Sequence, residues 1–169
     1  KGTALQADTQ GDVTVTGDLS ADTGEVKAYT KDGNISLTGD ATATQDDVLL
    51  QSDNGSIGVT GNLNGGTSVT ADATNGDVGI NGNVDSGTAT TLKATNGSVT
   101  QTGDHLTAGT TLTATATEGS VTLTDTNGVT SNNGDMTLTA SDTAGTDENG
   151  NILVTGPVDA NNGTHTASI

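Results

Sequence analysis

The sequence predicts an all-β fold: a parallel β-helix, or β-solenoid, of about seven coils with 21–22 residues and three short strands each. Three observations support this prediction. A glycine recurs at nearly constant spacing, apolar residues follow it at every second position, and an Asp-Gly or Asn-Gly dipeptide marks the turn in five of the seven copies. The recurring glycines are Gly11, Gly33, Gly55, Gly76, Gly97, Gly119 and Gly150, at intervals of 22, 22, 21, 21, 22 and 31 residues.

One strand of each coil follows this glycine. An aliphatic residue stands two positions after the glycine in every copy, and a second one stands four positions after it in all copies except the fifth, where Gln101 replaces it. Alternating apolar positions are typical of a strand, because successive side chains point to opposite faces. The first of these columns consists of Val13, Ile35, Ile57, Val78, Val99, Val121 and Ile152.

Two more strands complete each coil. Six positions after the recurring glycine stands a corner glycine, which Asp125 replaces in the sixth copy. Eight positions after it, an apolar residue begins the next strand; in the fifth copy either His105 or, after a slip of one residue, Leu106 fills this place. A further apolar pair precedes each recurring glycine by about seven and five residues, as Val48 and Leu50 do. This pair predicts the remaining strand.

Strands joined by Asn-Gly could instead pair as antiparallel hairpins. We favour the coil, because a meander of hairpins has no reason to return the same residue type to the same place every 21–22 residues. In a coil, equivalent residues stack about 4.8 Å apart, and the aliphatic columns form a continuous, narrow core. We expect right-handed winding, the usual sense of parallel crossovers.

The composition alone would suggest disorder. Leu, Ile, Val and Phe account for only 30 of the 169 residues, and the net charge is −17. The regular repeat argues against disorder, because stacked coils bury small side chains efficiently.

Only four Lys and Arg residues are present, so we expect no nucleic-acid partner. No apolar run approaches the ~20 residues of a membrane span, so we expect no membrane insertion. The chain has no cysteine and hence no disulfide framework.

The sixth copy departs from the regular spacing. Its interval of 31 residues contains about nine more residues than the others, and we assign them to two loops, at 126–135 and 141–148. We expect residues 1–169 to form a single solenoid domain. Its two ends are in the same phase of the repeat and show no amphipathic capping helix, which favours a segment of a longer rod or a subunit that stacks end to end.

The repeated phrase resembles the rod repeats of filamentous-haemagglutinin-type adhesins, which bacteria export by two-partner secretion. The matching features are Asx-Gly turns, Gly-x-Val-x-Val strands and the Thr-Gly corners at Thr16-Gly17, Thr38-Gly39, Thr60-Gly61, Thr102-Gly103 and Thr155-Gly156. The resemblance covers nearly the whole chain. It implies a right-handed β-helical shaft, an extracellular or cell-surface location, and adhesion or structural reach without catalysis.

Enzymatic chemistry has little support in the sequence. Glycoside hydrolysis needs paired carboxylates in a groove, whereas the acidic residues here fall mostly on corners or outward strand positions, where solvated carboxylates keep a rod soluble. His105 and His165 stand in different coils with no Ser or Cys nucleophile evident beside them. We therefore expect no catalytic residues and no organic cofactor.

Calcium is the one cofactor for which the sequence offers candidates. The densest group of oxygen ligands is Asp142, Asp147, Glu148, Asn149 and Asn151. Hard cations prefer such oxygen ligands. The group does not match the EF-hand, since Ile152 stands where that loop has its glycine.

The sequence thus favours the structural shaft of a secreted bacterial adhesin or extracellular fibre. Its expected partners are further coils, from end-to-end self-association or from continuation of the same chain, and a host or surface glycan receptor. The alternatives are a carbohydrate- or surface-binding module that uses the two loops of the irregular coil, and a polysaccharide-active β-helix enzyme.

Overall fold

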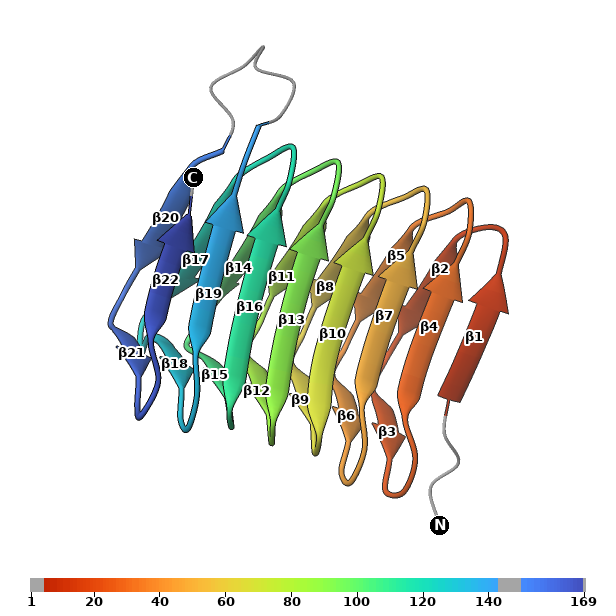
Figure 1. Cartoon of the computed structure of the whole chain (residues 1–169). Helices are drawn as coiled ribbons and strands as arrows, with labels where there is room; N and C mark the ends of the chain where they lie inside the picture. The colour runs from red at the N-terminus through yellow and green to blue at the C-terminus, as the bar shows by residue number, and fades with distance from the viewer. Residues whose placement is uncertain (1–4, 143–149, 169) are drawn as a thin grey trace.

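The computed structural model describes residues 5–142 and 150–168, and confirms the predicted β-solenoid. Within these residues the chain forms strands and turns but no helix. The strands lie in three parallel sheets, which we call A, B and C, and each coil contributes one strand to each sheet. Figure 1 shows the coils stacked into a rod that winds in the right-handed sense, with the N-terminal and C-terminal coils at opposite ends.

Sheet A has eight strands: β1 (Leu5–Thr9), β4 (Val26–Thr30), β7 (Val48–Ser52), β10 (Ser68–Ala73), β13 (Ala89–Ala94), β16 (Thr111–Ala116), β19 (Met136–Ala140) and β22 (His165–Ser168). Sheet B has seven: β2 (Val13–Thr16), β5 (Ile35–Thr38), β8 (Ile57–Thr60), β11 (Val78–Asn81), β14 (Val99–Gly103), β17 (Val121–Asp125) and β20 (Ile152–Thr155). Sheet C also has seven: β3 (Leu19–Ala21), β6 (Ala41–Ala43), β9 (Leu63–Gly65), β12 (Val84–Ser86), β15 (Leu106–Ala108), β18 (Val129–Ser131) and β21 (Val158–Ala160).

The register of the sheets places each residue above its equivalent in the previous coil. Ile57 pairs with Val78, and Val78 pairs with Val99, so the offset equals one repeat. All pairs of neighbouring strands are parallel. Backbone hydrogen bonds between coils continue into the corners, for example from Gly61 N to Asn81 O at 3.0 Å. The hairpin alternative is therefore wrong, and the strand on either side of each Asn-Gly turn belongs to a different sheet.

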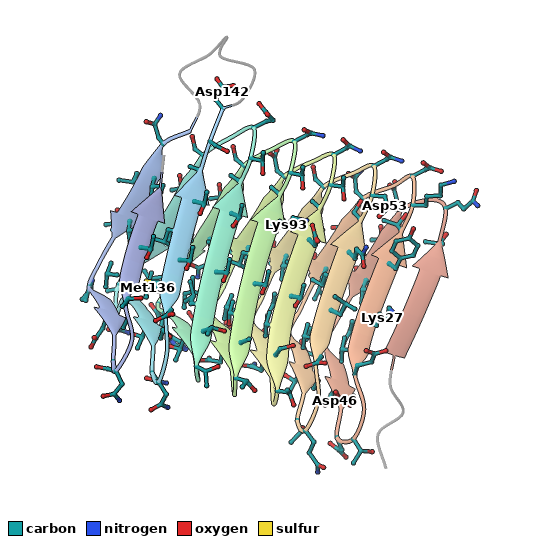
Figure 2. The ribbon with its side chains drawn as sticks, viewed as in Figure 1. Lys27, Asp46, Asp53, Lys93, Met136 and Asp142 are labelled. Atoms are coloured by element: carbon teal, nitrogen blue, oxygen red, sulfur yellow. The ribbon has the colours of Figure 1, made fainter. Side chains whose placement is uncertain are left out.

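The core is a column of aliphatic side chains enclosed by the three sheets. Alternate residues of each inner strand are buried, as the sequence pattern predicts. Leu63, Leu92 and Leu106 have no exposed surface at all. The sheets are close together, so alanines fill much of the remaining space, and Met136 is the only buried thioether among the described residues (Figure 2). Burial of this apolar surface is the main force that holds the coils together.

In the fifth coil the structure decides between the two candidates for the inward position. Leu106 pairs with Val84 below and Val129 above, so the chain does slip by one residue. His105 lies at the corner between β14 and β15, about one-third exposed.

The irregular coil differs from the prediction in one respect. The stretch 126–135 is not a loop that leaves the coil, because it contains β18, which pairs with β15 and β21. The offset between equivalent residues is 22 at Val99–Val121, 23 at Leu106–Val129 and 24 at Leu112–Met136. Each corner beside β18 thus absorbs a single extra residue. The offset then rises to 31 at Val121–Ile152, which places the other seven extra residues between β19 and β20. Most of the predicted loop 141–148 lies outside the described residues.

The corner between sheets B and C changes at the same point. In the first four coils it is turned by a glycine with positive φ, as at Gly17 and Gly61. In the fifth and sixth coils the sheet B strands continue for one more residue, to Gly103 and Asp125, which pair with each other. This extension turns the Asp125 side chain into the core, where it is 1% exposed.

Candidate functional site

The corner between sheets A and B carries a ladder of polar side chains. One residue after the recurring glycine, a Ser, Asp or Asn accepts a hydrogen bond from the backbone N–H of its equivalent in the next coil. Asn34 N donates to Asp12 Oδ1 at 2.7 Å, and Ser56 N donates to Asn34 Oδ1 at 2.8 Å. The ladder continues through Asp77, Ser98, Ser120 and Asn151. The accepting side chains, from Asp12 to Ser120, therefore satisfy backbone donors that the strands leave unpaired.

A second ladder follows the corner between sheets B and C. Asp40 N donates to Asp18 Oδ1 at 2.9 Å, and Asn62 N donates to Asp40 Oδ1 at 2.7 Å. The series extends through Asn83 to Asp104. A third ladder joins side-chain amides: Asn54, Asn75 and Asn96 each donate from Nδ2 to the side-chain oxygen of the residue one coil below, beginning at Asp32.

These ladders give the corner carboxylates a structural role that the sequence analysis missed. The sequence predicts that their charge keeps the rod soluble, and the structure shows that Asp12, Asp18 and Asp40 also act as hydrogen-bond acceptors between coils. The signal was present in the sequence, since a short polar residue with a side-chain oxygen follows the recurring glycine in all seven copies. Figure 2 shows two further corner carboxylates, Asp53 and Asp46, at opposite ends of the sheet A strands.

The predicted calcium ligands are only partly described. Asp142 forms an isolated antiparallel bridge with Glu118 beside the corner ladder, and Asn151 N donates to Ser120 Oγ at 3.3 Å. Asp147, Glu148 and Asn149 lie outside the described residues. Within the part of the chain that is described, no group of three or more His, Cys, Asp or Glu side chains is arranged to hold a metal ion. Calcium at this position stays a prediction.

His105 is paired with a carboxylate. Its Nε2 lies 2.8 Å from Asp85 Oδ2, one coil below, and the side chains of His105 and Asp85 are 34% and 44% exposed. A histidine beside an aspartate supplies two of the three members of a nucleophilic triad. Ser86, which follows Asp85 in the sequence, is buried and hydrogen-bonded to Thr90 at 2.9 Å. The pair therefore acts as a surface ion pair when His105 is protonated.

Two hollows on the described surface are shallow. The larger, of about 510 Å³, lies on the outer face of sheet B over Gly58 and Gly79 and is bordered by Ser36, Thr60 and Thr100. It contains no charged residue. The smaller, of about 220 Å³, lies on sheet C and contains a single carboxylate, that of Asp85. Neither hollow has the pair of carboxylates that glycoside hydrolysis requires.

The most unusual polar group is buried. Gln101, the exception in the second aliphatic column, is fully buried and donates from Nε2 to Asp125 Oδ1 and to Gly82 O, both at 2.9 Å. Burial raises the pKa of the Asp125 carboxyl above its ordinary value of 3.8, against the lowering effects of the Gln101 hydrogen bond and of nearby His105. The structure thus joins two residues that the sequence marked separately as exceptions to the repeat.

No helix that could cross a membrane occurs in the described residues. A search of protein-family models, curated proteins and solved structures finds no match to this chain.

Proposed function

We propose that this chain is a structural shaft: a β-solenoid segment of a secreted bacterial adhesin or extracellular fibre, which provides reach and performs no catalysis. The observation that carries the proposal is the repetition of the same bonds in successive coils. Three sheets and three side-chain ladders run along the rod, and corner carboxylates such as those of Asp12, Asp18 and Asp32 join one coil to the next.

A stack of similar coils gives the protein its length. Seven coils at a rise of about 4.8 Å span roughly 34 Å. Stability in a solenoid is the sum of the coils and their interfaces, so a rod can be lengthened without redesigning a core. The resemblance of the Thr-Gly corners to rod repeats of filamentous-haemagglutinin-type adhesins supports a bacterial, extracellular setting.

A further coil is the partner that the C-terminal face fits best. In the last coil Val158 is 43% exposed, whereas Val129 directly beneath it is fully buried. A coil of the same chain, or of a second copy stacked end to end, would cover Val158 in the way that β21 covers Val129. A host or surface glycan receptor would then be bound elsewhere in the assembly.

Deletion of one complete coil tests the shaft proposal. Removal of residues 57–77 joins Ser56 to Val78, which already occupies the equivalent place one coil later. Spin labels on cysteines introduced at Thr16 and Thr155, six strands apart in sheet B, should report a distance of about 29 Å that shortens by about 4.8 Å. The matched control, deletion of 57–67, removes only half a coil and should abolish folding because inward and outward positions no longer align.

Two results would count against a shaft without further activity. The first is specific glycan binding that disappears when residues 141–148 are replaced by a short Asn-Gly turn, which would favour the binding-module alternative. The seven extra residues between β19 and β20 are the observation behind that alternative. The second is the release of reducing ends from a polysaccharide incubated with the purified chain, which would favour an enzyme.

A further inference from the structure

The interior of the rod contains one carboxyl group among the described residues, that of Asp125. In six of the seven repeats a glycine stands at this position. The sheet B strands β14 and β17 each run one residue further than those below, and this extension points Asp125 inward toward Gln101 of the previous coil. The two side chains are 1% and 0% exposed.

The hydrogen bonds of this pair are incomplete if Asp125 is ionised. The Gln101 amide has two N–H donors, and both are used, one by Asp125 Oδ1 and one by Gly82 O. Gln101 Oε1 and Asp125 Oδ2 are buried and have no partner. A buried acceptor without a donor costs about 1–3 kcal/mol, and more if it is charged.

We propose that Asp125 is a buried proton-binding site: its carboxyl is protonated in the folded chain and donates from Oδ2 to Gln101 Oε1. The acid and the amide then exchange two hydrogen bonds, from Nε2 to Oδ1 and from Oδ2 to Oε1. A single proton supplies a partner to both unsatisfied oxygens and removes an uncompensated charge from the core.

The charged groups around Asp125 do not replace this proton. His105 and Asp104, on the corner after β14, act on the carboxyl in opposite directions. His105 is bound to Asp85 at 2.8 Å, and Asp104 is exposed. The neighbouring strands β18 and β20 carry no titratable side chain. No ion pair among the described residues includes Asp125.

The proton makes the stability of the rod depend on pH in an unusual direction. Because the carboxyl binds its proton more tightly in the folded than in the unfolded chain, its contribution to stability is complete below the unfolded pKa of 3.8. The contribution is lost as the pH rises through the higher pKa of the folded state. Within that window, the ratio of folded to unfolded chain should fall by about tenfold per pH unit.

A carboxyl-carbon NMR titration of the full chain, labelled with ¹³C-aspartate, tests the proposal directly. We expect the Asp125 carboxyl to lose its proton at a higher pH than the exposed aspartates in the same titration. An Asp125 resonance that titrates together with the exposed aspartates, or at a lower pH, would overturn the proposal, since a water molecule or another donor would then satisfy the two oxygens.

Two variants provide a second measurement. Asp125→Asn reproduces the proposed pattern, because its amide donates to Gln101 Oε1 while its oxygen accepts from Nε2. We expect it to unfold less readily than the wild type near neutral pH and to lose the pH dependence assigned to Asp125. Asp22→Asn, the matched control, removes an exposed carboxyl in another coil and should retain that dependence. Identical pH profiles for Asp125→Asn and the wild type would refute the proposal, and if Asp125→Asn does not fold the wild-type titration still decides.

Discussion

Replacing Gly76 by alanine should destabilise the solenoid, whereas the same replacement at Gly79, three residues later in the same coil, should not. Gly76 lies in the turn between sheets A and B, directly above Gly55. A Cβ added at Gly76 would lie 2.5 Å from the carbonyl carbon of Gly55 and 2.8 Å from Ser56 N. At Gly79, on the outer face of β11, the nearest atom to an added Cβ is Ile57 O, at 3.9 Å.

The structure sets the size of each effect. Ordinary Cβ contacts are 3.4–4 Å long, so alanine at Gly76 requires the backbone of one coil to move away from the next by about 1 Å. Overpacking of this kind costs about 1–3 kcal/mol. Alanine at Gly79 meets no obstacle and restricts the unfolded chain, which should stabilise the protein by about 0.5–1 kcal/mol. The two melting temperatures should therefore differ by roughly 3–16 °C, at about 2–4 °C per kcal/mol for a chain of this size.

Thermal unfolding followed by far-ultraviolet circular dichroism measures this difference. Gly58→Ala provides a matched control for Gly79→Ala, because its added Cβ would also meet nothing closer than 4.0 Å. Equal melting temperatures for Gly76→Ala and Gly79→Ala would refute the reasoning, since they would mean that the turns of successive coils are not in close contact.

Four further predictions follow from the core, the ladders and the titrating corner. Leu92→Ala, at a fully buried position, should cost about 2–5 kcal/mol of unfolding free energy in a urea titration, and a loss below 1 kcal/mol would contradict the packed core. Asp40→Ala should cost about 1 kcal/mol because Asn62 N loses its acceptor, while Asp40→Asn keeps an acceptor and should cost less. Hydrogen bonds from Thr164 N and Oγ1 hold the pKa of Asp135 below 3.8. The stability that these bonds give is therefore present above pH 3.8 and is lost as the pH falls through the lower pKa of the folded state. Hydrogen exchange of the Thr164 amide should become faster in the wild type than in Asp135→Asn only in that acidic range. Addition of a chelator should leave the melting temperature unchanged if the shaft needs no calcium, and a lower melting temperature would instead support a calcium site that includes Asp142 and Asn151.

The fold was predictable because one repeat carries nearly all of its information. The aliphatic column from Val13 to Ile152 determines which residues point inward, and the interval of 21–22 residues determines which residues stack. Small departures from the repeat were harder to predict. The repeat does not show at which corners the extra residues of the sixth coil are inserted. A corner can absorb one extra residue, as the two corners beside β18 do, without changing which residues of the next strand point inward.

The polar groups were predictable as exceptions but not as partners. Gln101 and Asp125 interrupt different columns, four and six positions after their glycines, in successive coils. They meet only because both strands extend past the usual corner, and the sequence gives no sign of that extension beyond the missing glycine itself. The corner ladders escaped prediction for another reason: acidic and amide residues at turns suit exposure to solvent equally well.

The stacking of each coil on the next is the central claim, and nuclear Overhauser contacts around Val78 test it most directly. A parallel solenoid predicts backbone contacts from Val78 to Ile57 and to Val99, each one repeat away. Antiparallel contacts from Val78 and Ile80 across the Asn75–Gly76 turn to Ala73 and Ala71, with none to Ile57 or Val99, would contradict the account.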